Sequence, residues 1–452
     1  MTEETGDGPA MRSRGRTVMR ARRSLADICG RRAGRVRRRR RCAIVPRSMT
    51  PAGKLALLAS LYLAQGMPYG FFSQFLPAML REQGVSLEGV GLASLLALPW
   101  ALKFAWAPLV DRHGLDRFGR RRSWIVPLQV LTVITLLALA TVDPTVDLQA
   151  LVVGVLALNF LASTQDIATD GLAVTILTPA ERGLGNGVQV AAYRLGMILC
   201  GGVLLILYPW LGWTRVCQCM AGAIALTTLP IAAFRGEPRP EQGERPGLAA
   251  FTEFFRRPGV GSWLAAIAAF KLGEAFGVGM LRPFFIDLGL GLADIGWLTG
   301  TAGFLASLVG AMVGGAFVAS YGRYRCLFVF AAVQALAVAS YAIPAAGVRD
   351  GWVLYALCTF EHFSSGMATA ALFTMMMDAA RPHTAGTDYT IQASVVVLAT
   401  GLGASLSGFS AAELGYAQHF LLAAVLCVIG VLPAVQHHGR VRRGETELAN
   451  VP

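Results

Sequence analysis

NFLASTQDIATDG, residues 159–171, and AAYRLGMILCGG, residues 191–202, are apolar enough to lie in a bilayer, yet they contain Asp166, Asp170 and Arg194. A charge at the centre of a membrane-spanning helix costs about 2.5–3.5 kcal/mol on insertion scales, so each of the three needs a partner or a wet cavity. Charges placed in this way indicate a functional site.

A helix over residues 159–171 would carry one narrow polar stripe. At 100° per residue, its polar positions fall within an arc of about 60°; they are Asn159, Ser163, Asp166 and Asp170. We expect this stripe to face a transport pathway inside the protein and not the lipid.

The composition is that of a polytopic membrane protein. Of the 452 residues, 54% are hydrophobic and 15% are charged, and the mean hydropathy is +0.53. These values are too apolar for an ordinary soluble chain of this length. The eight cysteines lie mostly inside apolar runs without a CxxC pair, so we expect small buried side chains, and neither disulfides nor a metal site.

The net charge of +13 is concentrated at the amino terminus. Residues 1–48 contain fifteen arginines against four acidic residues, a net charge of +11. So dense a block of like charge is expected to be disordered. We interpret it as sequence upstream of a native start at Met49, with binding of RNA or anionic lipid as the alternative. For the protein itself we expect no nucleic-acid partner.

Twelve stretches are long and apolar enough to span a bilayer. They lie near residues 55–80, 87–107, 123–142, 148–171, 185–207, 212–234, 260–286, 293–318, 325–345, 352–377, 388–411 and 416–436. The predicted fold class is therefore an all-α membrane protein with twelve transmembrane helices.

Arginine is unevenly distributed between the loops. Even-numbered loops and the tail after the last span contain seventeen arginines, whereas odd-numbered loops and span ends contain four. Because positively charged loops stay in the cytoplasm, both termini are predicted to be cytoplasmic.

The longest connection, residues 235–259, is rich in Pro and Gly and separates six spans from six. GVSLEGVG at 84–91 recurs as GLGLADIG at 289–296, which indicates a parallel repeat about an axis along the membrane normal. We divide the chain into an arm at 1–48, a first six-helix half at 49–234, a cytoplasmic linker at 235–259, a second half at 260–436 and a cytoplasmic tail at 437–452.

The loop between the second and third spans contains Asp111, Arg112, Gly119, Arg120 and Arg121. An Asp near a helix end, followed by a turn glycine and arginines, can pair with helix termini and release them when the halves move. The loop resembles the cytoplasmic signature loop of the major facilitator superfamily, lengthened by a few residues. The resemblance implies a gating role, and arginines that only set topology are the alternative. The counterpart in the second half lacks the Asp.

Within that superfamily, four stretches resemble the AmpG-type permeases: LKFAWAPLVDR at 102–112, STQDIATD at 163–170, ERG at 181–183 and YRLGM at 193–197. This group includes muropeptide permeases and the related RhtX/FptX siderophore transporters. LREQGVSL at 80–87 and AGTDYTIQ at 385–392 are closer to the siderophore branch.

The resemblance implies import across the bacterial inner membrane by proton symport. The sequence contains no Walker-type phosphate loop. We therefore expect no nucleotide hydrolysis and no cofactor, and the proton gradient is the expected energy source.

Asp166 and Asp170 are the predicted proton-coupling residues. A carboxylate in a low-dielectric cavity can bind and release a proton near neutral pH, and two carboxylates one helical turn apart resist joint ionisation. The alternative is a static Asp166–Arg194 pair that only joins the fourth and fifth spans.

Four more charged residues lie within predicted spans and are assigned to the proton or substrate pathway: Lys103, Lys271, Glu274 and Glu361. Lys271 and Glu274 are spaced i, i+3, so a structural pair between them is the alternative. His362, beside Glu361, is expected to be a core residue.

A bulky amphipathic substrate needs aromatic contacts. The candidates are Phe71, Phe72, Phe75, Phe270 and Phe276, with helix packing as the alternative.

We predict a monomeric secondary transporter in the lipid bilayer that imports a small molecule by alternating access. The first expected cargo is a siderophore, ferric or iron-free, and the alternative is a muropeptide or another amphipathic conjugate. A membrane-embedded acyltransferase that uses His362 and Glu361 as acid and base belongs to a different class. The two-half repeat argues against it, so we predict that the protein is not an enzyme.

Overall fold

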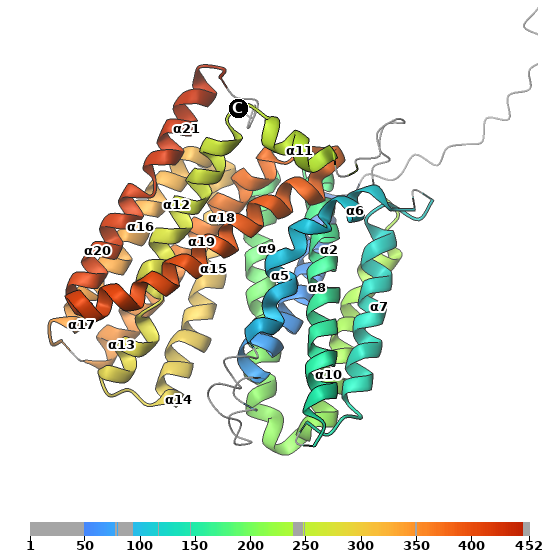
Figure 1. Ribbon diagram of the computed structural model, residues 1–452, viewed down its shortest axis with the longest axis horizontal. Coiled ribbons are helices and arrows are strands. Elements are labelled where there is room, and N and C mark those ends of the chain that lie inside the picture. Colours follow the sequence, from blue (N-terminus) through green and yellow to red (C-terminus); the bar gives the residue numbers. More distant parts are fainter. Residues whose placement is uncertain are drawn as a thin grey trace, which may run out of the picture. The chain divides into compact units, whose positions relative to one another are not determined.

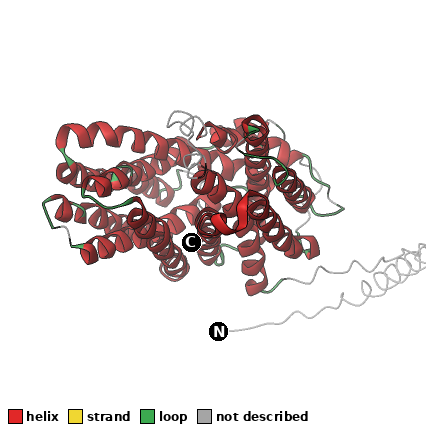
Figure 2. Ribbon diagram, turned by 90° about the horizontal axis from the view of Figure 1, so that it is seen from below, coloured by secondary structure: helices red, strands yellow, loops and turns green. Residues whose placement is uncertain are grey.

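The computed structural model describes residues 49–76, 79, 94–115, 117–144, 146–237, 247, 249–348 and 350–445. Within these residues every regular element is a helix (Figure 2). The arm predicted at 1–48 and the first copy of the predicted repeat, at 84–91, lie outside the described residues.

Local sequence explains where the helices of the first half begin. Thr50 caps α2, since its hydroxyl accepts a hydrogen bond from the Gly53 N–H at 3.2 Å, and Asp147 caps α8 in the same way. The elements are α2 Pro51–Gly70, η1 Phe71–Phe75, η2 Ser94–Ala97, α5 Leu98–Leu102, η3 Lys103–Ala105, α6 Ala107–Arg112, α7 Arg122–Leu139, α8 Leu148–Ile176, α9 Arg182–Met197, η4 Ile198–Val203 and α10 Leu204–Ala233.

In the second half, Gly322 allows a sharp turn between α15 and α16, because its φ of 90° is one that other residues rarely adopt. The elements are α11 Ala249–Arg256, α12 Val260–Val278, α13 Leu281–Asp287, α14 Leu292–Ile295, η5 Gly296–Ala302, α15 Gly303–Tyr321, α16 Arg323–Ser340, α17 Ala342–Ala345, α18 Gly351–Ala379, η6 Pro382–Thr384, α19 Ala385–Leu414, α20 Tyr416–Ile429 and α21 Leu432–Arg442.

Nine helices of the described part are long and apolar enough to cross a membrane. One of them, Arg182–Ala233, covers two predicted spans and is interrupted at Gly212, whose φ is 70°. The predicted span at 352–377 corresponds to α18, which is 29 residues long and carries several polar residues. The span predicted at 87–107 is described only from residue 94 onward. The helices therefore fit the twelve predicted spans.

Large apolar side chains cover much of the outer surface. Trp210, Leu226, Leu398 and Phe409 are each more than 60% exposed. In water such a surface would favour association, whereas in a bilayer it contacts acyl chains. The polar stripe of α8 and the ion pairs Lys103–Asp166 and Lys271–Glu274 lie inside the protein instead.

The two halves are built in the same way. Figure 1 shows the helices of residues 51–233, blue to green, beside those of residues 249–442, yellow to red. In the first half α2 packs along α9, and in the second half α12 packs along α19. The halves meet where α9 packs on α15 and where α8 packs on α19. Helices α8, α9, α15 and α19 therefore place residues of both halves around one central space.

Close contact between α2 and α9 depends on glycine. A Cβ atom at Gly66 would lie 2.1 Å from the backbone oxygen of Tyr193, and one at Gly196 would lie 2.5 Å from that of Leu63. A larger residue at either position must therefore push the two helices apart.

We expect Gly66→Val to lower the melting temperature in detergent by several degrees, because overpacking costs about 1–3 kcal/mol or more when a backbone atom blocks the new side chain. The matched control is Gly222→Val in α10, where an added Cβ meets nothing within 4 Å. Equal melting temperatures for the two variants would contradict this account of the packing.

Candidate functional site

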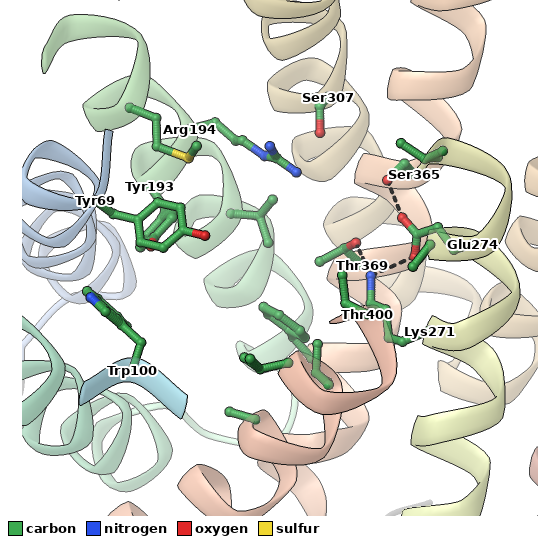
Figure 3. Close-up of a pocket in the computed structure, with 18 of the residues that line it drawn as sticks. Tyr69, Trp100, Tyr193, Arg194, Lys271, Glu274, Ser307, Ser365, Thr369 and Thr400 are labelled. Atoms are coloured by element: carbon green, nitrogen blue, oxygen red, sulfur yellow. Dashed lines mark hydrogen bonds and ion pairs between the residues drawn. The ribbon is translucent and has the colours of Figure 1, made fainter. Parts of the chain in front are cut away.

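A cavity of about 860 Å³ lies between the two halves. Its walls come from α2, α5, α8 and α9 of the first half and from α12, α15, α18 and α19 of the second. Figure 3 shows side chains of both halves directed into this space. The volume is in the range that holds a drug-sized molecule, so the cavity is the candidate substrate site.

The polar stripe of α8 is buried, as the sequence predicts. Asn159, Ser163, Asp166 and Asp170 are each at most 7% exposed. Asp166 forms an ion pair with Lys103, which lies in the short 3₁₀ segment between α5 and α6. The structure therefore brings together a cation and a carboxylate from two predicted spans.

Asp170 has neutral partners. The Tyr62 hydroxyl donates a hydrogen bond to it at 2.8 Å, and Gln189 Nε2 donates a longer one at 3.5 Å. Gln189 Nε2 also donates to the hydroxyl of Tyr389 in the second half, at 3.4 Å. Within the described residues Asp170 has no ion-pair partner, so two carboxylates share one neighbouring lysine.

Arg194 extends from α9 into the cavity (Figure 3). Its guanidinium carbon lies 5.0 Å from the centroid of the Phe304 ring, on α15 of the other half. The static Asp166–Arg194 pair that we considered as an alternative is not formed, and Asp166 forms its ion pair with Lys103 instead.

The second half contributes a separate polar cluster. Lys271 Nζ lies 2.7 Å from Glu274 Oε2 and donates a hydrogen bond to Thr369 Oγ1 at 2.9 Å, while Ser365 donates to Glu274 at 2.5 Å (Figure 3). The i, i+3 pair that we considered as the alternative is thus present. Its members line the same cavity as Asp166.

Glu361 and His362 also line the cavity and contact each other. His362 Nδ1 lies 2.8 Å from Glu361 Oε2, and Gln334 Nε2 donates to the other carboxylate oxygen at 2.9 Å. Glu361 is therefore satisfied within the second half.

Aromatic residues form one wall of the cavity, but they are not the ones that we named. Tyr69 lies at 5.5 Å from Trp100 and 5.7 Å from Tyr193, measured between ring centroids, and all three line the cavity. For the candidates Phe71, Phe72, Phe75, Phe270 and Phe276 the alternative of helix packing holds, since these side chains pack in hydrophobic cores and are not among the lining residues. Tyr and Trp combine an apolar ring with a polar group, which suits a wet cavity.

Hydrogen bonds and ion pairs join the halves at one end of the helices. This end carries Arg112, Arg121, Arg182 and Arg323 and is here called the arginine-rich face. Asp111 accepts hydrogen bonds from the Thr387 N–H at 2.6 Å and from its hydroxyl at 2.5 Å, at the start of α19. The first N–H groups of a helix have no partner within it and attract negative charge.

The other residues of the predicted gating motif surround Asp111 or its loop. The Arg121 guanidinium pairs with Asp111, and both are buried. Arg120 is buried, whereas Arg112 is exposed. Gly119 has a φ of 95°, a conformation that favours glycine and lets the chain turn into α7. The structure thus gathers the motif at one inter-half contact.

A second contact on this face was missed. Asp378, at the end of α18, accepts hydrogen bonds from Arg182 Nη1 and Arg323 Nε, both at 2.8 Å. Arg182 belongs to the first half and Arg323 to the second. We counted both arginines as topology signals, with Arg182 also in the AmpG-like ERG stretch and Arg323 in the second-half counterpart of the signature loop, but we gave neither a partner. A carboxylate at the end of a predicted span was a usable sign.

The linker also reaches this face. Glu237 accepts a hydrogen bond from the Arg121 N–H at 2.8 Å and a longer one from the Arg122 N–H at 3.4 Å. These N–H groups belong to the first turn of α7, so Glu237 caps that helix from outside it. Burial raises the pKa of the Glu237 carboxyl above its ordinary value, although the hydrogen bonds and the charges of Arg120 and Arg121 oppose this.

Comparison with known protein families identifies the fold. Residues 58–400 match the family model of the Major Facilitator Superfamily. The chain belongs to this superfamily. It is therefore a multi-pass membrane protein of a transporter family, and the acyltransferase alternative draws no support from this result.

Relatives within the superfamily point to one group. The chain is 28% identical to the anhydromuropeptide permease of Escherichia coli strain K12, over 83% of this chain and 78% of that protein. It is 31% identical to an uncharacterised protein of Haemophilus influenzae, over 84% and 93% of the two chains. It is 26% identical to putative transporter AmpG 4 of Rickettsia felis, over 81% and 92%. These relatives support the AmpG-like group and give no support to the siderophore branch.

Solved structures of the superfamily share the fold. The proton:xylose symporter XylE, bound to 6-bromo-6-deoxy-D-glucose, has a TM-score of 0.67 and 14% identity, over 85% of this chain and 95% of that one. The human organic anion transporter MFSD10 has a TM-score of 0.60 and 14% identity, over 85% and 99%.

Removing Lys103 alone should destabilise this superfamily member. Lys103→Met leaves Asp166 buried without its cation, which costs about 3–5 kcal/mol for a buried pair. The double variant Lys103→Met with Asp166→Asn removes both charges and should recover most of the loss. Thermal unfolding in detergent measures both, and a single variant as stable as the wild type would contradict a compensated pair.

Glu237 should make docking of the linker depend on pH. The linker is docked when Glu237 accepts the hydrogen bonds of the Arg121 and Arg122 N–H groups. In this state the pKa of the Glu237 carboxyl is higher than that of a solvated carboxyl, so protonation favours docking. Protection of the Arg121 and Arg122 amides from hydrogen exchange, corrected for intrinsic rates, should therefore increase as pH falls through the raised pKa towards the ordinary value.

Glu237→Gln should remove this pH dependence, and Glu253→Gln, at a side chain that is 56% exposed, should leave it unchanged. Protection that rises with pH in the wild type would overturn the assignment.

Proposed function

We propose that this protein imports a muropeptide, a sugar joined to a short peptide, across the bacterial inner membrane by proton symport. The observation that carries the proposal is the likeness to a protein named anhydromuropeptide permease over most of both chains. A siderophore, our first expectation from the sequence, becomes the competing cargo in the test below.

The cavity suits such a conjugate. Aromatic rings on the first-half wall offer apolar faces for a sugar ring, and hydroxyl and charged groups of the second half offer partners for peptide groups. The side chain of Gln65 lines the cavity with both polar atoms buried and without a hydrogen-bond partner among the described residues. A buried polar group without a protein partner favours a polar ligand.

Alternating access accounts for the arrangement of the two halves. The arginine-rich face is the cytoplasmic one by the distribution of arginine between loops. Contacts of Asp111 with Thr387 and of Arg182 with Asp378 hold the halves together there. In this state the cavity would receive cargo from the periplasmic side, as import requires.

Asp170 is the group that we assign to proton exchange. Its partners Tyr62 and Gln189 are neutral, and it lies one turn from Asp166, which is held by Lys103. A neutral carboxyl group can remain next to Asp166 where a second carboxylate would be repelled. Loading and loss of one proton would thus change the charge of the cavity by one unit.

The test is uptake of a radiolabelled anhydromuropeptide by proteoliposomes containing the full chain. We expect accumulation that requires an imposed proton gradient. Asp170→Asn should abolish gradient-driven accumulation while keeping exchange of cargo across the membrane, because Asn can still accept the hydrogen bond of Tyr62. Asp147→Asn, at the cap of α8, is the matched control and should behave like the wild type.

Two results would reject parts of the proposal. Uptake of a ferric or iron-free siderophore without uptake of the muropeptide would replace the cargo. Gradient-driven accumulation that survives Asp170→Asn would remove this residue from proton coupling.

A further inference from the structure

Arg194 differs from the two lysines of the cavity. Lys103 and Lys271 each form an ion pair with a carboxylate. Arg194 has no ion-pair partner within the described residues; its guanidinium lies over the Phe304 ring. A cation in a membrane-embedded cavity is costly unless an opposite charge or water compensates it.

Each carboxylate of the cavity has a protein partner other than Arg194. Asp166 is held by Lys103, Glu274 by Lys271 and Ser365, and Glu361 by His362 and Gln334. Asp170 is bound by Tyr62. None of them lies within ion-pair distance of Arg194 in the described residues, so the guanidinium N–H groups are open to an anionic ligand.

Ser307 supplies a second donor at the same place. It is 1% exposed, it lines the cavity, and its hydroxyl oxygen has no hydrogen-bond partner among the described residues. Ser307 lies three residues after Phe304 on α15, and therefore on the same face of that helix. Figure 3 shows the Arg194 guanidinium extended towards Ser307. Donors from the first and second halves thus converge on one region.

The geometry of the arginine favours a carboxylate. The Phe304 ring centroid lies 5.0 Å from the guanidinium carbon, and the planar guanidinium carries N–H groups that can form two parallel hydrogen bonds. Carboxylates match this fork, and the charged hydrogen bonds are about twice as strong as neutral ones. Ser307 can donate one further hydrogen bond to the same anion.

We infer that Arg194 and Ser307 bind a carboxylate of the transported molecule, and that this carboxylate joins α9 of one half to α15 of the other. The inference rests on the proposed function and narrows it: the cargo must carry a free acid group at the position that reaches this pair. It also makes the acid group a link between cargo binding and movement of the halves.

The first arm of the test measures binding of an anhydromuropeptide and of the same compound with its peptide carboxylates converted to amides, using the full chain in detergent. We expect the wild type to bind the acid with about tenfold or more higher affinity than the amide, because the amide cannot form the charged hydrogen-bonded pair. Arg194→Gln should bind both forms alike, and Ser307→Ala should reduce the preference in part. Arg194→Lys keeps the charge without the fork and should be intermediate.

Arg215→Gln is the control, since Arg215 is an exposed arginine of α10 that is not among the residues lining the cavity. It should keep the wild-type preference. A variant of Arg194 that still favours the acid, or a wild type that binds acid and amide equally, would overturn the inference.

The second arm separates the anion site from the identity of the cargo. Millimolar N-acetylalanine and its amide are compared for their effect on the melting temperature of wild type and Arg194→Gln. One outcome is that the acid but not the amide stabilises the wild type, that Arg194→Gln loses this effect, and that no muropeptide binds in the first arm. That outcome would support the anion site and reject the muropeptide as cargo. Equal responses to acid and amide in both arms would overturn the site.

Discussion

A charged side chain within the bilayer must be compensated by another group of the protein, by water or by a ligand, because hydrocarbon offers no partner. The arrangement of this protein follows from that constraint. Apolar side chains face outward, and the charged ones lie where the halves meet. The space between the halves therefore holds buried charged side chains of both halves, and it is also the region that must change when the halves move.

Two kinds of inter-half contact have different consequences. At the arginine-rich face, Asp111 meets the start of α19 and Asp378 meets Arg182, so protein groups compensate each other. In the cavity, Arg194 lies beside the Phe304 ring of the other half and forms no ion pair within the described residues. The first kind holds one end together without cargo. At the second kind of contact, bound cargo can bridge the two halves. The free energy of cargo binding can then favour one arrangement of the halves over another.

The resemblance found in the sequence is confirmed for the superfamily and for the AmpG-like group, whereas the relatives give no support to the siderophore branch. The stretches behind that choice, 80–87 and 385–392, do different things in the structure. The first lies entirely outside the described residues. The second forms the start of α19, where Thr387 binds Asp111 and Asp388 binds Arg381. Tyr389 of this stretch lines the cavity, but Thr387 and Asp388 join helices, and such residues say little about cargo.

The sequence by itself determined which segments leave water, because that depends on the length and composition of each apolar run. It also determined that Asp166 and Asp170 share one buried face of a helix, since a period of 3.6 residues is local. Only the tertiary structure decided the partners. Lys103 reaches Asp166 across 63 residues of chain, and Arg182 reaches Asp378 across 196. Such pairs depend on how whole helices pack against one another, and no local pattern of residues contains that information.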